Sequence, residues 1–164
     1  MTDLHLSADA LTGGTAPDRA AILEKFRAYL VANADMDWQS LQAIWSGAPE
    51  ATFFNLNGHT YQGREQWTRL WQYYKPRVTN GVWEPFDLGG MVTGDMAVVW
   101  CHRRTWYKWV GDGPMDAGRR PERSSISLAT MVFRKEDGAQ GTKDWRVVHV
   151  HFSTASEDPR PGGI

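Results

Sequence analysis

The periodicity of this chain changes at Pro76, from helical spacing before it to strand-like alternation after it. Apolar residues recur at helical spacing up to about Asn33, between Asp37 and Gly47, and again just before Pro76. Strand patterns occupy residues 51–56, about 91–109, 123–135 and 144–153. The predicted order is α-α-β-α-β-β-β-β. It indicates an α+β fold, in which a curved antiparallel sheet wraps around the N-terminal helices to form a cone.

The length of 164 residues is that of one domain. Both ends are rich in Gly, Pro and small polar residues without periodicity. We therefore expect a flexible segment at residues 1–16, a single α+β barrel domain at residues 17–154 and a flexible tail at residues 155–164.

Charge and hydropathy exclude several classes of partner. The formal net charge is −1 and the 18 Lys and Arg are scattered, so a nucleic-acid partner is not expected. No apolar stretch approaches the roughly 20 residues that span a bilayer, and the first residues lack a signal-peptide layout. Cys101, which lies in an apolar strand pattern, is expected to be a buried free thiol. These features predict a cytoplasmic protein without a membrane partner.

Aromatic residues are unusually abundant, with nine Trp, five Tyr and six Phe. Rings of this size are difficult to pack in a small domain without leaving a concavity. We expect some of them to line a pocket for a small aromatic molecule, the alternative being that they only fill the core.

Three segments carry a family resemblance. The run FFNLNGHTYQGREQW, the final VFRKEDG and WRVVHVHFS, and NADMDWQSLQAIW resemble parts of the SnoaL-like, nuclear-transport-factor-2-like superfamily, which includes the ketosteroid-isomerase-like proteins. The resemblance spans residues 18–154 and implies the cone-shaped fold. The superfamily hosts isomerases, dehydratases and other enzymes, as well as the association domain of calmodulin-dependent kinase, so fold alone does not give an activity.

Alternation assigns the faces of the long strands, since every second side chain shares a face. The side chains at odd positions from Ala97 onward change from apolar to polar along the strand, as expected if they extend from the floor of a pocket to its mouth. The resemblance implies that the same residues face inward. That set comprises Ala97, Val99, Cys101, Arg103, Thr105 and Tyr107. The resemblance favours Ser125, Ser127, Ala129 and Met131 as the inward residues of the next strand, and Val148, Val150 and Phe152 as those of the last. For Arg103 and Tyr107 an exposed strand end is the alternative.

This register turns His149 and His151 outward, together with His102. A zinc site is one interpretation of the histidines, but no cluster with ligand spacing supports it, and no metal is expected. The interpretation we favour is a homodimer surface that also contains Trp100 and Trp106.

Polar residues near the predicted pocket provide the candidates for catalysis. Asp35 resembles the aspartate that supports proton transfer in the dehydratase-type branches, although helix capping is an alternative role. Asn55 stands where ketosteroid isomerases carry their general base, and an amide cannot accept that proton. The histidine that dehydratase-type relatives carry after the third helix is missing from KPRVTNGVW, and His59 could substitute for it, with an exposed loop histidine as the alternative. The predicted catalytic residues are Asp35, Arg103, Tyr107 and His59. The predicted substrate contacts are Tyr29, Trp38, Phe53, Asn55, Trp71, Cys101, Thr105, Ser127, Val150 and Phe152.

No nucleophile elbow, dinucleotide loop, Walker loop or zincin motif is present in the sequence. We therefore predict an enzyme without a cofactor, a lyase or isomerase that performs elimination, dehydration or retro-aldol deformylation on a hydrophobic aromatic molecule. Among the branches of the superfamily, the diarylpropane formaldehyde-lyases that act on lignin-derived compounds fit the abundance of rings. The alternative is a non-catalytic small-molecule-binding or association module. Convergence of Asp35 and Arg103 in one closed cavity would favour the enzyme.

Overall fold

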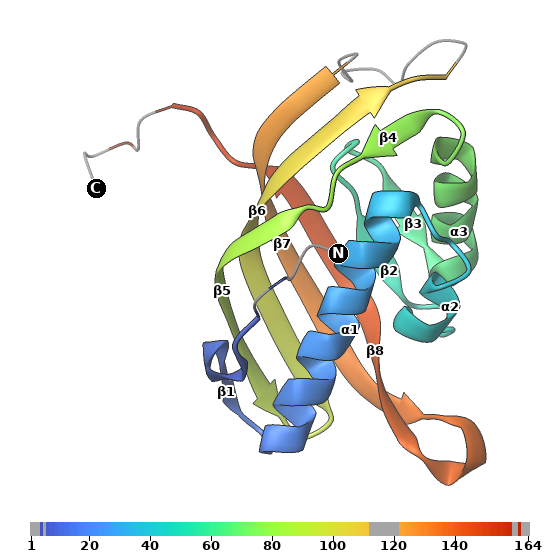
Figure 1. The fold of residues 1–164 in the computed structure, drawn as a ribbon. Coiled ribbons are helices and arrows are strands. Elements are labelled where there is room, and N and C mark those ends of the chain that lie inside the picture. The colour runs from blue at the N-terminus through green and yellow to red at the C-terminus, as the bar shows by residue number, and fades with distance from the viewer. Residues whose placement is uncertain (1–3, 5, 112–121, 159–160, 162–164) are drawn as a thin grey trace.

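The computed structural model describes residues 4, 6–111, 122–158 and 161 (Figure 1). The helices are α1 (Ala16–Asp35), α2 (Leu41–Ile44) and α3 (Gly63–Tyr74), with 3-10 turns η1 (Ala8–Ala10) and η2 (Ala139–Gly141). The strands are β1 (Leu11–Gly13), β2 (Thr52–Phe54), β3 (Thr60–Gln62), β4 (Val78–Asn80), β5 (Glu84–Thr93), β6 (Met96–Trp109), β7 (Glu122–Asp137) and β8 (Lys143–Thr154). Within the described residues, no helix has the length and apolar character needed to span a bilayer.

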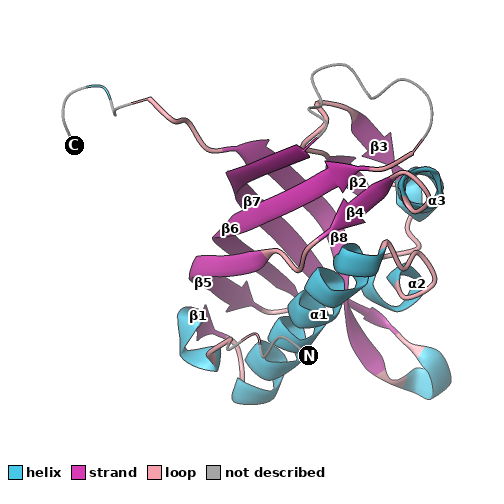
Figure 2. Cartoon of the chain, turned by 45° about the horizontal axis from the view of Figure 1, so that its top comes forward, coloured by secondary structure: helices cyan, strands magenta, loops and turns pink. Residues whose placement is uncertain are grey.

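One strongly curved sheet wraps around α1, with α2 and α3 beside it (Figures 1 and 2). Its strands follow the order β1-β5-β6-β7-β8-β2-β3, and β4 pairs with β6. The predicted α+β class and the curved sheet around the N-terminal helices are confirmed. The sheet is mixed and not wholly antiparallel, because β1 pairs in parallel with β5 and β2 pairs in parallel with β8.

Capping residues define the two ends of α1. Thr15 accepts a hydrogen bond from the backbone of Asp18, and Pro17 lies in the first turn, where its missing N–H costs nothing. At the other end Met36 takes the left-handed conformation, with φ 49°, and its N–H bonds the carbonyls of Ala32 and Asn33. The predicted apolar face is buried as expected, and the helix runs two residues past its predicted end.

The N-terminal segment differs from its prediction. Residues 1–16 were expected to be flexible, yet Leu11 is buried in β1, whose partners are residues 90–92 of β5, and Leu4 is buried as well. A strand of three residues is too short to show a period, so only its apolar residues could have indicated it. Residues 112–121, between β6 and β7, lie outside the described part of the chain.

Two strand details correct the predicted register. The segment expected as one strand from about residue 91 to 109 is the end of β5 and the whole of β6, joined by a turn in which Gly94 has φ +56°. Val132 of β7 pairs with His149 of β8, whereas the next residue, Phe133, pairs with Val147. Val148 of β8 is therefore the extra residue of a β-bulge. The bulge shifts the alternation by one residue, and Val147 is buried where Val148 was expected.

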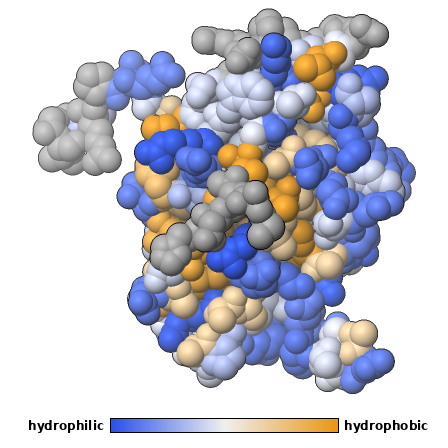
Figure 3. Space-filling model, viewed as in Figure 1, coloured by the Kyte–Doolittle hydropathy of each residue, from blue (hydrophilic) through white to orange (hydrophobic). Residues whose placement is uncertain are grey.

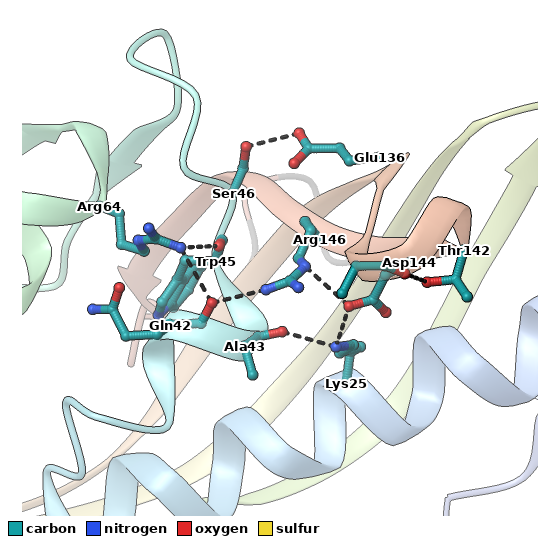
Figure 4. A network of polar contacts seen from close by, with 11 residues as sticks. Lys25, Gln42, Ala43, Trp45, Ser46, Arg64, Glu136, Thr142, Asp144 and Arg146 are labelled. Atoms are coloured by element: carbon teal, nitrogen blue, oxygen red, sulfur yellow. Dashed lines mark hydrogen bonds and ion pairs between the residues drawn. The ribbon is translucent and has the colours of Figure 1, made fainter.

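The last carbonyls of α2 are held by cations from three other elements (Figure 4). The contacts are Arg146 to Gln42 at 2.8 Å, Arg64 to Gln42 at 3.1 Å, and Lys25 to Ala43 at 2.8 Å. Asp144 lies between two of these cations, 2.9 Å from Lys25 and 3.0 Å from Arg146. A helix of four residues has little stability of its own, so these contacts fix the position of α2 and of the buried Trp45 that follows it.

Asp18 ties the start of α1 to the final hairpin. Lys135 Nζ lies 2.6 Å from Asp18 Oδ1, Trp145 Nε1 donates to the same oxygen at 3.1 Å, and Thr15 Oγ1 donates to Oδ2. The contacts with Lys135 and then Thr15 hold the pKa of Asp18 at about 2, below its usual 3.8.

We expect this carboxylate to set part of the acid stability. Its pKa is lowered on folding, so its stabilisation is full above the unfolded pKa and is lost as the pH falls through the folded value. The loss amounts to about 2 kcal/mol between about pH 5 and about pH 2. Asp18→Asn should flatten this part of the stability curve, measured by urea denaturation across that range. Glu24→Gln, at an exposed ion pair with Arg27, is the control. An Asp18→Asn curve that falls as steeply as the wild type would contradict this assignment.

Candidate functional site

A cavity of about 260 Å³ lies among α1, α3 and the curved sheet. Its lining is aromatic and amide-rich, and none of the described lining residues is charged or a histidine. The lining residues are Tyr29, Asn33, Met36, Asn55, Leu56, Asn57, Gly58, Trp67, Leu70, Trp71, Tyr74, Asn80, Trp83, Thr105, Tyr107, Ser125, Phe152 and Thr154. Figure 3 shows the face of the molecule that carries α1 as a mixture of hydrophobic and hydrophilic residues.

Arg103 lies directly beneath the wall of this cavity and is fully buried. Its Nε donates to Ser127 Oγ at 3.2 Å, and its Nη1 donates to the hydroxyl of Tyr29 at 3.3 Å. The guanidinium lies over the ring of Phe152 at 4.1 Å and near that of Trp83 at 4.9 Å. Three of these four neighbours, Tyr29, Phe152 and Trp83, line the cavity.

The charge of Arg103 has no counter-ion among the described residues. No carboxylate pairs with it, and Nη2 is buried without an acceptor. Arginine does not deprotonate in proteins, and burying an unpaired charge costs several kcal/mol. Contacts with the faces of two rings return only about 0.5–2 kcal/mol each. The site therefore holds a positive charge that is only partly compensated.

Tyr29 places a hydroxyl between this cation and the cavity. Burial raises the pKa of Tyr29, and the nearby Arg103 only partly offsets the effect, so the phenol is protonated at neutral pH. Its oxygen already accepts a hydrogen bond from Arg103, which leaves its own hydrogen free to be donated. Tyr29 therefore offers the cavity a hydroxyl donor with the positive charge of Arg103 behind it, an arrangement suited to an oxygen that carries negative charge.

Asn33 lies one turn after Tyr29 on the same face of α1 and also lines the cavity. Its side-chain Nδ2 is buried without an acceptor, as is the Nε1 of Trp67, another lining residue. The unsatisfied buried groups at this site are thus all donors.

The loop between β2 and β3 forms one rim of the cavity. Asn57 Nδ2 donates to the hydroxyl of Tyr61 at 2.8 Å and to that of Tyr74 at 3.1 Å, which fixes the rim against α3. Gly58 has φ +80°, a conformation that glycine adopts without strain. A shallower depression that shares Asn57 and Tyr74 adjoins the cavity and is lined by His59.

The predicted catalytic residues separate in the structure. Arg103 is inward and buried, and Tyr107 lines the cavity. Asp35 was expected in the cavity, and this placement is wrong. Helix α1 continues through Asp35, which lies about 200° around the helix from Asn33 and is exposed. Lys75 donates to the carbonyl of Asp35 at 3.1 Å, and the left-handed Met36 lines the cavity. His59 is exposed in the adjoining depression and does not line the main cavity.

The predicted substrate contacts divide by depth. Those that line the cavity are Tyr29, Asn55, Trp71, Thr105 and Phe152. The others do not line it: Phe53, Cys101, Ser127 and Val150 are buried, and Trp38 packs against the core. Nearer the narrow end of the cone, the inward side chains pack in the core. Alternation identifies inward residues but does not distinguish those that line the cavity from those that fill the core. Asn33 could have been found, because it continues the helical spacing of Phe26 and Tyr29.

The histidines of β8 face outward as expected, and neither lines the cavity. His149 Nδ1 lies 2.8 Å from Thr52 Oγ1, and both His149 and His151 pack edge-on against the ring of Phe54. Burial, followed by the nearby His151, lowers the pKa of His149. No group of three or more His, Cys, Asp or Glu side chains able to hold a metal ion occurs in the described part of the chain.

Comparison with known proteins identifies the family. The SnoaL-like domain matches residues 22–157, most of the chain. The chain belongs to the SnoaL-like domain family. No curated protein matches this SnoaL-like chain.

Solved structures confirm the nuclear-transport-factor-2-like fold of this SnoaL-like chain. An NTF2-like protein of unknown function from Pseudomonas putida is 22% identical, covering 86% of this chain and 89% of that chain, with a TM-score of 0.62. A putative dehydratase from Streptomyces avermitilis is 20% identical (85% and 97% covered, TM-score 0.63). The CaMKII hub of S. rosetta is 23% identical (83% and 95% covered, TM-score 0.60). At these identities the likeness extends to the fold alone.

Proposed function

We propose that this SnoaL-like chain is a lyase or isomerase that acts, without a cofactor, on a hydrophobic aromatic small molecule in the cavity. The observation that carries the proposal is the buried Arg103, which has no counter-ion and lies against Tyr29 beneath an aromatic wall. Such a pair stabilises an oxygen that gains negative charge during a reaction more than it stabilises the neutral ground state.

Elimination, isomerisation and retro-aldol cleavage beside a carbonyl share one intermediate. A C–H or C–C bond breaks at the carbon next to the carbonyl, and its electron pair moves onto the carbonyl oxygen to form an enolate. Arg103 and Tyr29 would stabilise that oxygen. The proton removed would pass to an imidazole nitrogen of His59 in the adjoining depression, and then either to the leaving hydroxyl or back to carbon.

The size of the cavity favours a compact substrate. Its volume of about 260 Å³ lies just below the ~300–1,000 Å³ of sites that bury drug-sized ligands. A single ring with a short side chain suits it. A lignin-derived diaryl compound would have to place its second ring in the adjoining depression beside His59.

The test is turnover of β-hydroxypropiophenone, which can lose formaldehyde to give acetophenone or lose water to give phenyl vinyl ketone. We expect one of these products, or exchange of the protons next to the carbonyl in D₂O, at a rate well above that in buffer. Proton NMR follows all three. Binding without product or exchange would contradict a catalytic role.

A second candidate is a non-catalytic binding or association module. It is favoured by the absence of any carboxylate or imidazole from the described lining of the cavity, since such groups usually act as bases near neutral pH. The likeness to a kinase hub agrees with it. Saturable binding with no turnover of any aryl ketone would support this function.

We expect a homodimer that forms through the outer face of the sheet. Large apolar side chains are exposed there on β5, β6 and β7, namely Met91, Met96, Trp100, Ile126 and Leu128. Sedimentation should show a dimer at micromolar concentration, and Leu128→Glu should dissociate it. Val31→Glu, on the exposed side of α1, should not. A wild-type monomer under these conditions would remove the proposal.

A cytoplasmic location is also proposed, because burial raises the pKa of the Cys101 thiol to about 11 and the free thiol suits a reducing compartment.

A further inference from the structure

We propose that the substrate is an anion, an aromatic molecule of one ring whose carboxylate binds at the end of the cavity lined by Tyr29 and Asn33, with the buried Arg103 behind Tyr29 as its counter-charge. This inference rests on the proposed function, since it names the chemical class of ligand for the same cavity. It goes beyond that function because the negative charge is present before any reaction occurs.

The first argument is the charge of the site. Arg103 is fully buried, its described partners are the neutral hydroxyls of Ser127 and Tyr29, and its Nη2 has no acceptor. Tyr29, Phe152 and Trp83 lie between the guanidinium and the cavity, so Arg103 attracts a carboxylate through its charge and through the hydroxyl of Tyr29. Within the described chain no Asp or Glu occupies that place, so the counter-ion is supplied by the ligand.

The second argument is the polarity of the cavity. The unsatisfied buried groups of Arg103, Asn33 and Trp67 are all N–H donors, and Tyr29 has an O–H to donate. A ligand whose polar end carries only acceptors is compatible with these donors, whereas an alcohol or amine would bring further donors. A carboxylate beside the reacting carbonyl presents only acceptor oxygens.

The third argument is the surrounding surface. Rings of Trp83 and Phe152 cover the guanidinium and also line the cavity, together with Trp67 and Trp71. A benzene ring attached to the carboxylate would therefore pack on these rings while its charged end faced Tyr29 and the arginine behind it.

Calorimetric titration of the wild-type protein with matched pairs of probes tests the inference. The pairs are benzoate with benzamide, phenylacetate with phenylacetamide, and cinnamate with cinnamamide. At least one carboxylate should bind about tenfold or more tightly than its amide, as expected for a hydrogen bond to a charged partner. Equal affinity, preference for the amides, or no binding of any carboxylate would overturn the inference.

Two neighbouring arginines provide a matched pair of variants. Arg103→Gln should remove the preference for the carboxylate, whereas Arg104→Gln should keep it, because Arg104 is exposed on the opposite face of β6 and lies over Phe86. If Arg103→Gln does not fold, Tyr29→Phe should still reduce the preference several-fold. Preference for carboxylates supports this inference whether or not β-hydroxypropiophenone is turned over, and turnover without that preference would overturn it while leaving the catalytic proposal, so the two can fail separately.

Discussion

Replacing Arg103 by glutamine is expected to lower the turnover number for β-hydroxypropiophenone by about 10²- to 10³-fold, because the positive charge behind Tyr29 that stabilises the developing oxyanion is lost. Glutamine keeps a polar side chain of moderate length but removes the charge. The measurement is the initial rate of product formation at saturating substrate, with circular dichroism to confirm that the variant folds.

The controls for this prediction come from the same strand and from α1. Arg104→Gln should change the rate by less than about threefold, since Arg104 faces away from the cavity. Asp35→Asn should be equally mild, because the structure places Asp35 at the exposed end of α1. An Arg103→Gln variant that folds and keeps most of its turnover would show that the guanidinium is structural. A large loss in Asp35→Asn would instead support the base that the family resemblance implies.

Replacing Trp45 by alanine is expected to lower the free energy of unfolding by about 3–5 kcal/mol, the range for removing a large buried ring. Trp45 is completely buried and makes edge contacts with Tyr29, Phe53 and Trp67 at ring distances of 5.5, 4.9 and 5.6 Å. It does not line the cavity, so its loss should act mainly through stability. The measurement is urea denaturation, in which the slope of the unfolding free energy against urea concentration should stay unchanged.

Tyr73→Ala is the matched control for Trp45→Ala. This aromatic residue of α3 is 40% exposed, and it contacts Tyr74 and the side chain of Arg77. Its removal should cost less than about 1 kcal/mol. A Trp45→Ala effect as small as that of Tyr73→Ala would mean that the cluster around α2 adapts to the loss of the ring.

The sequence determined which residues face inward over most of the chain. Helical spacing placed Phe26 and Tyr29 on the buried face of α1, and alternation placed Arg103 and Thr105 on the inner face of β6. These predictions succeeded because burial repeats with the geometry of each element, so a long element carries the signal many times. The family was recognised from the sequence for a similar reason, since its pattern extends over most of the chain.

Only the tertiary structure decided the positions that depend on a single residue or on a distant contact. Helix α1 continues two residues beyond its predicted end and so carries Asp35 away from the cavity, and one extra residue, Val148, shifted the alternation of β8. The last residue of a helix and a single bulge are not set by a repeating pattern. The depth of the cavity also depends on how many side chains from separate strands meet at one level, which is why Val150 is core while Phe152 lines the site. That Arg103 lacks a counter-ion follows from where every carboxylate of the described fold lies, and no local pattern records it.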